Sequence, residues 1–148
     1  MDINKNLEEI ENIEKYLRKI DYIVRLNGRE ILSDFNMTVP QFSALQILIH
    51  NGTMTIGELS QKMALACSTI TDLIDRMEKN DLVIRKKDEK DKRVVKVEVL
   101  SNGHDILKQV LKKRVEFLDG KLIHFSEDDK AKLNKGLKAL HEAMKDES

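Results

Sequence analysis

Residues 55–79 read TIGELSQKMALACSTITDLIDRMEK, and they carry apolar side chains at the spacing of two short amphipathic helices. The first helix is expected to start at a capping box, in which Thr55 precedes Glu58 by three residues. The second is expected over residues 67–79, after an interruption at residues 64–66, with a buried stripe of Ile70, Leu73, Ile74 and Met77. Two short helices that meet across a tight turn are typical of a helix-turn-helix, which this stretch therefore predicts.

Residues 82–100 follow directly and change from helical periodicity to strict alternation. Valines at 95, 97 and 99 alternate with charged residues, which is typical of a half-buried strand. The polar run at residues 88–91 separates this strand from a second one and predicts a hairpin tip. A β-hairpin after a helix-turn-helix is a wing, so residues 38–100 predict a winged helix-turn-helix with its wing at residues 82–100.

Further helices are predicted on both sides of this unit. Residues 3–32 carry a narrow apolar stripe, and a helix over residues 39–50 follows the capping sequence that begins at Thr38. Ser101 and Ser126 are expected to cap two more helices after the wing. The fold class predicted from the sequence is therefore mainly α with a small β-wing.

The stripes at both ends of the chain are too long to be buried on the small central unit alone. We therefore expect residues 1–36 and 101–148 to be dimerisation helices that flank the winged unit in a symmetric homodimer. The alternative is a monomeric bundle that folds back on itself. In both cases the 148 residues are expected to form a single domain.

Charge is unevenly distributed along a chain whose formal net charge is zero. Acidic residues gather near the N-terminus, whereas seven basic residues fall between 85 and 96. Such a basic stretch beside a helix-turn-helix favours a polyanion as partner, and double-stranded DNA is the polyanion that this motif commonly binds.

The single cysteine, Cys67, excludes an intrachain disulfide and favours a reducing compartment. The start of the sequence lacks the apolar segment of a signal peptide, and no apolar run approaches the roughly 20 residues that span a bilayer. We therefore expect a cytoplasmic protein with no membrane partner.

Several short motifs, taken in order, resemble the MarR family of bacterial regulators. The residues that carry the resemblance are Gln41, Thr55–Ser60, Ser68–Glu78, Leu82–Val83, Arg85, Asp91–Arg93 and Leu100–Ser101. The resemblance implies an obligate homodimer with intertwined terminal helices that binds a palindromic operator. It also implies a repressor that is released by a small aromatic effector or by thiol oxidation.

The helix over residues 67–79 is expected to enter the major groove, with its N-terminal residues facing base edges. Ser68, Thr69 and Thr71 can hydrogen-bond bases or phosphates, which the adjacent wing favours; the alternative is that they only cap and solvate the helix. Asp72 departs from the basic residue common in the family, and it requires either a cytosine amino group or neutralisation by Arg76. Arg76 is expected at the phosphate backbone or in an intrahelical pair with Asp72.

The wing supplies most of the expected attraction to DNA through the basic residues Arg85, Lys86, Lys87, Lys90, Lys92 and Arg93. The alternative is a solvated, charged turn. The resemblance implies that Asp91 braces the wing by pairing with a nearby arginine. It also implies that a basic residue at the tip, here Lys92 or Arg93, enters the minor groove.

Other sites are less well defined by the sequence. The resemblance places an effector pocket where the flanking helices join the winged unit, so the candidate lining residues are Tyr16, Tyr22, Arg25 and His50. Cys67 is a candidate redox switch, although a small half-buried residue is the simpler interpretation.

No catalytic or metal-binding pattern is found in the sequence. The four histidines lack paired metal-ligand spacing, and no nucleophile with a positioned base or phosphate loop is recognisable. We expect no enzyme activity, no metal and no cofactor. A winged helix that binds RNA or protein remains the alternative function.

Overall fold

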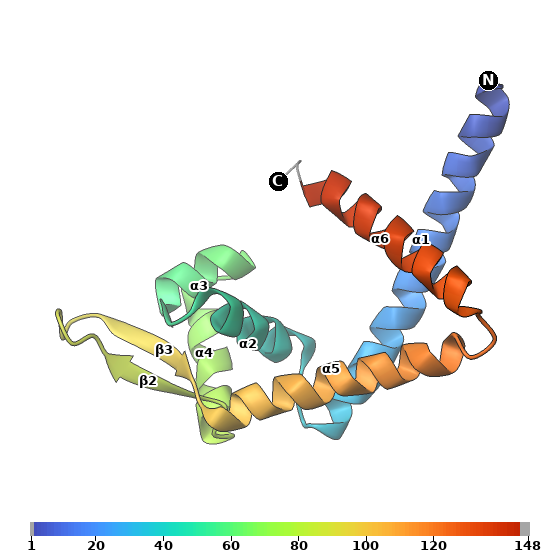
Figure 1. The fold of residues 1–148 in the computed structure, drawn as a ribbon. Helices are drawn as coiled ribbons and strands as arrows, with labels where there is room; N and C mark the ends of the chain where they lie inside the picture. Colours follow the sequence, from blue (N-terminus) through green and yellow to red (C-terminus); the bar gives the residue numbers. More distant parts are fainter. Residues whose placement is uncertain (1, 146–148) are drawn as a thin grey trace. The chain divides into compact units, whose positions relative to one another are not determined.

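The computed structural model describes residues 2–145, which are mainly helical with one small antiparallel sheet (Figure 1). The elements in chain order are α1 (Ile3–Asp34), α2 (Val39–Asn51), β1 (Met54–Thr55), α3 (Ile56–Met63), α4 (Cys67–Lys79), β2 (Val83–Lys87), β3 (Val95–Val99), α5 (Ser101–Lys121) and α6 (Glu127–Lys145). This confirms the predicted fold class.

The chain divides into two compact units, Met1–Arg114 and Val115–Ser148. The first unit contains the winged helix-turn-helix, and the second contains α6. A single domain over residues 1–148 stays a prediction, and its extreme ends, residues 1 and 146–148, lie outside the described residues.

Side-chain caps define the starts of three helices, as the sequence predicts. The Thr38 hydroxyl accepts a hydrogen bond from Gln41 N at 3.3 Å, and Gln41 Oε1 accepts one from Thr38 N at 3.1 Å, which completes a capping box. The Thr55 hydroxyl caps α3 by accepting from Glu58 N at 3.1 Å, but Glu58 Oε1 accepts from the Thr55 hydroxyl and not from Thr55 N, so only half of the predicted capping box is formed. Ser126 caps α6 at 3.1 Å from Asp129 N.

The start of α5 shifts by one residue from the predicted position. Helix α5 begins at Ser101 itself, so this serine is the first helical residue and not the cap before it. Helix α4 ends at Lys79, as predicted, and is followed by Asn80, with φ of −93°, and the left-handed Asp81, with φ of 59°. The left-handed backbone at Asp81 lets Leu82 N donate to Met77 O at 3.0 Å, and the Leu82 side chain is buried.

The sheet has the strand order β1-β3-β2, and both pairings are antiparallel. Val97 lies at its centre, opposite Met54 of β1 and Arg85 of β2. Strand β1 was not predicted, because two residues are too few to show alternation. Because β3 is the central strand, β2 is an edge strand. Strands β2 and β3 project as a hairpin beyond the helices (Figure 1).

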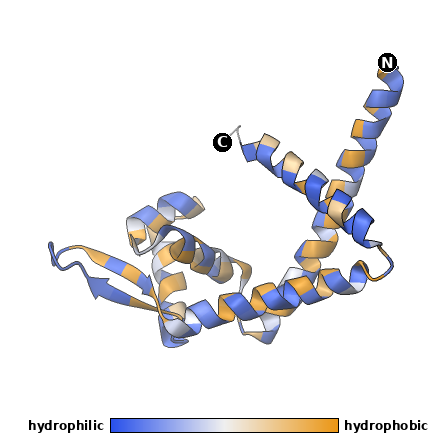
Figure 2. Cartoon of the chain, in the orientation of Figure 1, coloured by the Kyte–Doolittle hydropathy of each residue, from blue (hydrophilic) through white to orange (hydrophobic). Residues whose placement is uncertain are grey.

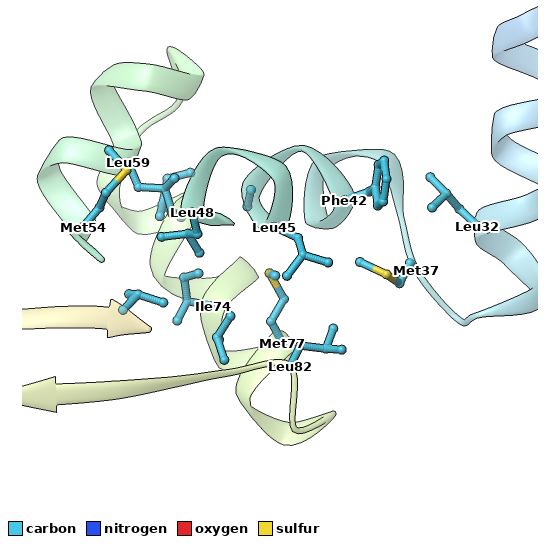
Figure 3. Close-up of a cluster of buried hydrophobic side chains, with 14 of the residues drawn as sticks. Leu32, Met37, Phe42, Leu45, Leu48, Met54, Leu59, Ile74, Met77 and Leu82 are labelled. Atoms are coloured by element: carbon cyan, nitrogen blue, oxygen red, sulfur yellow. The ribbon is translucent and has the colours of Figure 1, made fainter. Parts of the chain in front are cut away.

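The core lies in the first unit, where α2, α3, α4 and the sheet meet. Figure 3 shows Leu45 and Leu48 of α2 facing Ile74 and Met77 of α4, with Leu59 of α3 beside them. These side chains are at most 2% exposed. Burying them stabilises the arrangement that presents the opposite face of α4 to solvent.

Gly103 brings α5 unusually close to the end of the wing. A Cβ at this position would lie 2.6 Å from Leu82 O and 2.7 Å from Val99 Cγ1. No side chain fits at such distances, so glycine is what allows α5 to lie against the base of the wing.

Apolar residues recur along α1 and α6, as the hydropathy colours of Figure 2 show, and many of their side chains are exposed. On α1, Leu7, Ile10 and Ile20 are each more than half exposed. On α6, Leu137 and Met144 are 52% and 57% exposed. No described helix is long and apolar enough to cross a membrane.

Candidate nucleic-acid interface

Helix α4 turns its polar residues to solvent. Its inner face consists of Ile70, Ile74 and Met77, which are completely buried. The outer face carries the residues predicted to face DNA, and all of them are exposed: Ser68, Thr69, Thr71, Asp72 and Arg76. The helix thus presents a row of hydroxyl and charged groups away from the core.

Three of these side chains already have partners within α4. The Thr71 hydroxyl donates to Cys67 O at 2.9 Å, which leaves its oxygen lone pairs available as acceptors. Arg76 Nη2 lies 3.6 Å from Asp72 Oδ2, and both side chains are about two-thirds exposed. The intrahelical pair is therefore present, and at this distance it is loose enough to open toward another partner.

Arg85 faces α4 and not solvent, although it was predicted to contact DNA. Its Nη2 lies 2.6 Å from Asp75 Oδ1 and its Nη1 lies 3.3 Å from Glu78 Oε1. The same Nη2 donates to Thr71 O at 3.3 Å, and only 25% of the side chain is exposed. The wing is thus joined to α4 by a partly buried cation.

The remaining basic residues of the hairpin lie in solvent except Lys96, which is half-buried with its Nζ 3.8 Å from Asp88 Oδ1. Lys86 Nζ pairs with Glu98 Oε2 at 3.1 Å across the two strands. Lys87, Lys90 and Lys92 are exposed and form no ion pair with any described residue. Their charges are therefore available to an external anion.

The hairpin tip is organised by Asp91 and Arg93. Asp91 Oδ1 accepts from Arg93 N at 3.1 Å and from Arg93 Nε at 3.1 Å, and Arg93 Nη2 donates to Asp91 Oδ2 at 3.3 Å. Side-chain and backbone hydrogen bonds from Arg93 lower the pKa of the Asp91 carboxyl. The pairing that the resemblance implies for Asp91 is thus present, while the Arg93 side chain is 91% exposed.

The four candidate effector residues are not brought together. Arg25 lines a groove of about 310 Å³ with Phe42 and Arg114, among others. His50 lines a separate depression of about 660 Å³ beside Leu107. Tyr16 and Tyr22 are 55% and 66% exposed and line neither hollow.

Sequence reasoning missed Arg114, whose guanidinium lies 5.3 Å from the Phe42 ring centroid. Its Nε is buried and has no hydrogen-bond partner among the described residues. Because Arg114 follows Phe42 by 72 positions, no local pattern could have linked them.

Cys67 is exposed at the start of α4, so the interpretation as a half-buried residue is wrong. Ala66, the N-cap residue before it, forms no side-chain cap hydrogen bond. No group of three metal-ligating side chains occurs within residues 2–145.

The winged unit matches a known protein family. The model of the MarR family matches residues 37–95. The uncharacterized HTH-type transcriptional regulator YsmB of Bacillus subtilis strain 168 is 49% identical over 142 residues, which cover 96% of this chain and 97% of that protein. The chain belongs to the MarR family.

Solved structures agree with this assignment. A MarR family protein from Bacillus stearothermophilus shares 43% identity with this MarR-family chain, with a TM-score of 0.81, and covers 93% of this chain and 96% of that one. A MepR mutant from Staphylococcus aureus, solved bound to an oligodeoxyribonucleotide, shares the fold at a TM-score of 0.73 and 16% identity, over 89% of this chain and 97% of that one. The prediction of a DNA-binding transcriptional regulator is confirmed, since the chain belongs to the MarR family and its relative YsmB is an HTH-type transcriptional regulator.

Proposed function

We propose that this MarR-family regulator acts in the cytoplasm as a homodimeric repressor that binds a palindromic operator. The observation that carries the proposal is the exposed polar face of α4 next to a projecting, lysine-rich hairpin. A helix with this face fits the major groove, and a basic hairpin fits the flanking backbone.

In this proposal α4 is the recognition helix. Ser68 and Thr69 stand in its first turn, where side chains of such helices reach base edges, and Thr71 offers an acceptor. Asp72 accepts a hydrogen bond from a cytosine amino group, while Arg76 moves from its loose pair to a phosphate.

The wing gives affinity more than sequence information. Lys86, Lys87 and Lys90 neutralise phosphates and release condensed cations. Lys92 or Arg93 enters the minor groove, with the tip held in shape by Asp91.

The homodimer is supported by the apolar residues left exposed on the flanking helices. A soluble monomer rarely leaves long apolar stripes uncovered, and a two-fold symmetric dimer buries the same patch on both copies. Two wings related by this symmetry require two half-sites of opposite orientation, which is a palindrome.

An aromatic carboxylate is the effector class that the groove lined by Arg25, Phe42 and Arg114 favours. Arg114 lies over the Phe42 ring with a buried, unpaired Nε, and Arg25 adds a second guanidinium. Guanidinium groups bind carboxylates, and aromatic rings stack on one another. Benzoate is a suitable probe: calorimetry should detect its binding to the wild type, with loss in Arg114→Gln and retention in Arg18→Gln, a matched change on α1.

Thiol oxidation at Cys67 is the second route of release that the fold allows. The exposed sulfur stands at the N-terminus of α4, so a charged or bulky oxidation product there would lie beside DNA. Peroxide treatment of the wild type and of Cys67→Ser would separate this route from effector release.

The proposal is tested by selecting duplexes from a random DNA library with the wild-type protein and footprinting the winners. We expect an inverted repeat whose half-sites lie about 10 bp apart, or a multiple of this spacing. Affinity for the selected duplex should fall about tenfold or more in the double variant Lys92→Ala, Arg93→Ala, because contacts to the minor groove and phosphates are lost.

The matched control is Lys130→Ala, Lys135→Ala on α6, which removes the same charge from exposed positions outside the winged unit. Equal losses in both double variants, or selected duplexes with no common sequence, would exclude specific regulation through this wing. An RNA duplex that competes as well as the selected DNA would favour the alternative of an RNA-binding winged helix.

A further inference from the structure

Arg85 lies on the outer edge of the wing, where its backbone also needs a partner. Strand β2 pairs with β3 on one side only. The N–H of Arg85 donates on the other side, to Glu78 Oε2 of α4 at 2.8 Å. One carboxylate of α4 thereby satisfies an edge N–H that would otherwise face solvent.

The Arg85 guanidinium extends this connection along α4. It contacts Thr71 O, Asp75 Oδ1 and Glu78 Oε1 at 3.3, 2.6 and 3.3 Å. Residues 71, 75 and 78 follow one another at steps of four and three, so they form a row along one face of the helix. A rigid, planar group held at three points of such a row fixes both the distance and the angle of the strand.

Alternation along β2 places Arg85 between a buried and an exposed residue on the same face of the strand. Val83, Arg85 and Lys87 share one face of the strand, since side chains alternate with a period of two. Along this face Val83 is buried, Arg85 is half-buried and Lys87 is exposed. Arg85 is therefore the last residue on this face to touch α4, and beyond it the hairpin extends alone.

We propose that Arg85 is a positioning residue, which sets the angle of the wing relative to the recognition helix and does not itself bind DNA. The inference rests on the proposed binding of α4 and the wing to one operator. Two carboxylates and a carbonyl occupy three of the five N–H donors of Arg85, and only 25% of its side chain is exposed, so it is poorly placed to hold a phosphate.

The carboxylate partners of Arg85 give a test in which removing a negative charge is expected to lower the affinity for DNA. Glu78→Gln removes a negative charge. Because DNA is a polyanion, this loss of charge by itself raises the affinity for DNA. If Glu78 positions the wing through Arg85, the same substitution instead weakens binding to the selected duplex. We expect a loss of about tenfold, in the range typical of a lost charge-assisted hydrogen bond.

Salt dependence separates positioning from phosphate contact. Each neutralised phosphate contributes about 0.9 to the slope of log affinity against log salt concentration. Lys87→Ala, one step farther along the same strand face, should lower this slope. Arg85→Ala should weaken binding and leave the slope unchanged, and Arg85→Lys should restore part of the affinity by reaching one carboxylate.

Hydrogen exchange of the wing amides supplies a readout that needs no DNA. Glu78→Gln and Arg85→Ala should speed exchange over residues 83–99, whereas Lys87→Ala should not. This measurement distinguishes failure of the inference from failure of the operator proposal. Unchanged wing exchange in Glu78→Gln, a gain of affinity in Glu78→Gln, or a lowered salt slope in Arg85→Ala would each overturn the positioning role.

Discussion

Asp91 holds Arg93 by its backbone and its side chain together: three hydrogen bonds join the two residues across a single intervening lysine. Val94 N also donates to Asp91 O at 3.0 Å, so Asp91 also stabilises the turn that leads into β3. The guanidinium is thereby fixed at its base while almost all of its surface stays in solvent. The tip thus presents a cation of defined position.

This pair predicts a pH response of the wing tip. The hydrogen bonds of Arg93 lower the pKa of Asp91, so the carboxyl should titrate below its ordinary value of 3.8. The pair contributes stability above that value, and this contribution is lost as the pH falls through the lower folded-state pKa. A carboxyl-detected NMR titration measures the midpoint. Arg93→Ala should return it toward 3.8 and Lys92→Ala should leave it low, and a midpoint insensitive to Arg93→Ala would contradict the assignment.

Asp72 predicts a substitution that strengthens binding to unrelated DNA. Asp72→Asn removes an exposed acid from the outer face of α4 and releases Arg76 from its pair. Affinity for a random duplex should rise about fivefold, because one charge near a phosphate is worth about 1 kcal/mol in water. Preference for the selected duplex over the random one should fall, since the acceptor for cytosine is weakened.

Asp105→Asn is the matched control for this change, because it removes an equally exposed acid from α5. Fluorescence anisotropy at a single salt concentration compares the variants. Equal gains in both variants would mean that Asp72 acts only through net charge and does not read a base.

The helices could be predicted because their signals are local. The caps at Thr38, Thr55 and Ser126 lie within three residues of their partners, and the buried stripe of α4 lies within one helix. The same holds for the candidate site, where the Asp72–Arg76 pair spans four residues.

The direction of Arg85 could not be predicted, because its partners are set by tertiary packing. Asp75 lies ten residues before Arg85, and only the path through the turn at Asp81 places β2 beside α4. The Arg114–Phe42 contact has the same origin, since it joins α5 to α2. The sequence of a short basic run does not show which residues are exposed and which form ion pairs, because this depends on tertiary packing.

Substitution by alanine is expected to have opposite effects on the free energy of unfolding at Gly103 and at Gly136. Gly103→Ala places a Cβ against the Leu82 carbonyl and the Val99 side chain, and it should lower the free energy of unfolding by about 1–3 kcal/mol, the usual cost of overpacking. Gly136→Ala, on α6 with no atom within 4 Å of the added Cβ, should raise it by about 0.5–1 kcal/mol. Chemical denaturation measures both, and a neutral Gly103→Ala would show that α5 moves freely against the wing.

The apolar stripe of α1 predicts that a single charge there disrupts the homodimer. Ile10 is 53% exposed on a helix whose apolar residues recur along one face, and burial of each such side chain contributes about 1.5–3 kcal/mol. Ile10→Glu should therefore shift the protein toward the monomer in sedimentation velocity at micromolar concentration. Asn12→Glu adds the same charge to an exposed polar position of α1 and should leave the dimer intact. A wild-type monomer would contradict the proposed homodimer, and a dimer unaffected by Ile10→Glu would show that another surface joins the two copies. In the expected case, DNA binding by Ile10→Glu should lose its preference for an inverted repeat over a single half-site, because one wing can then bind without its partner.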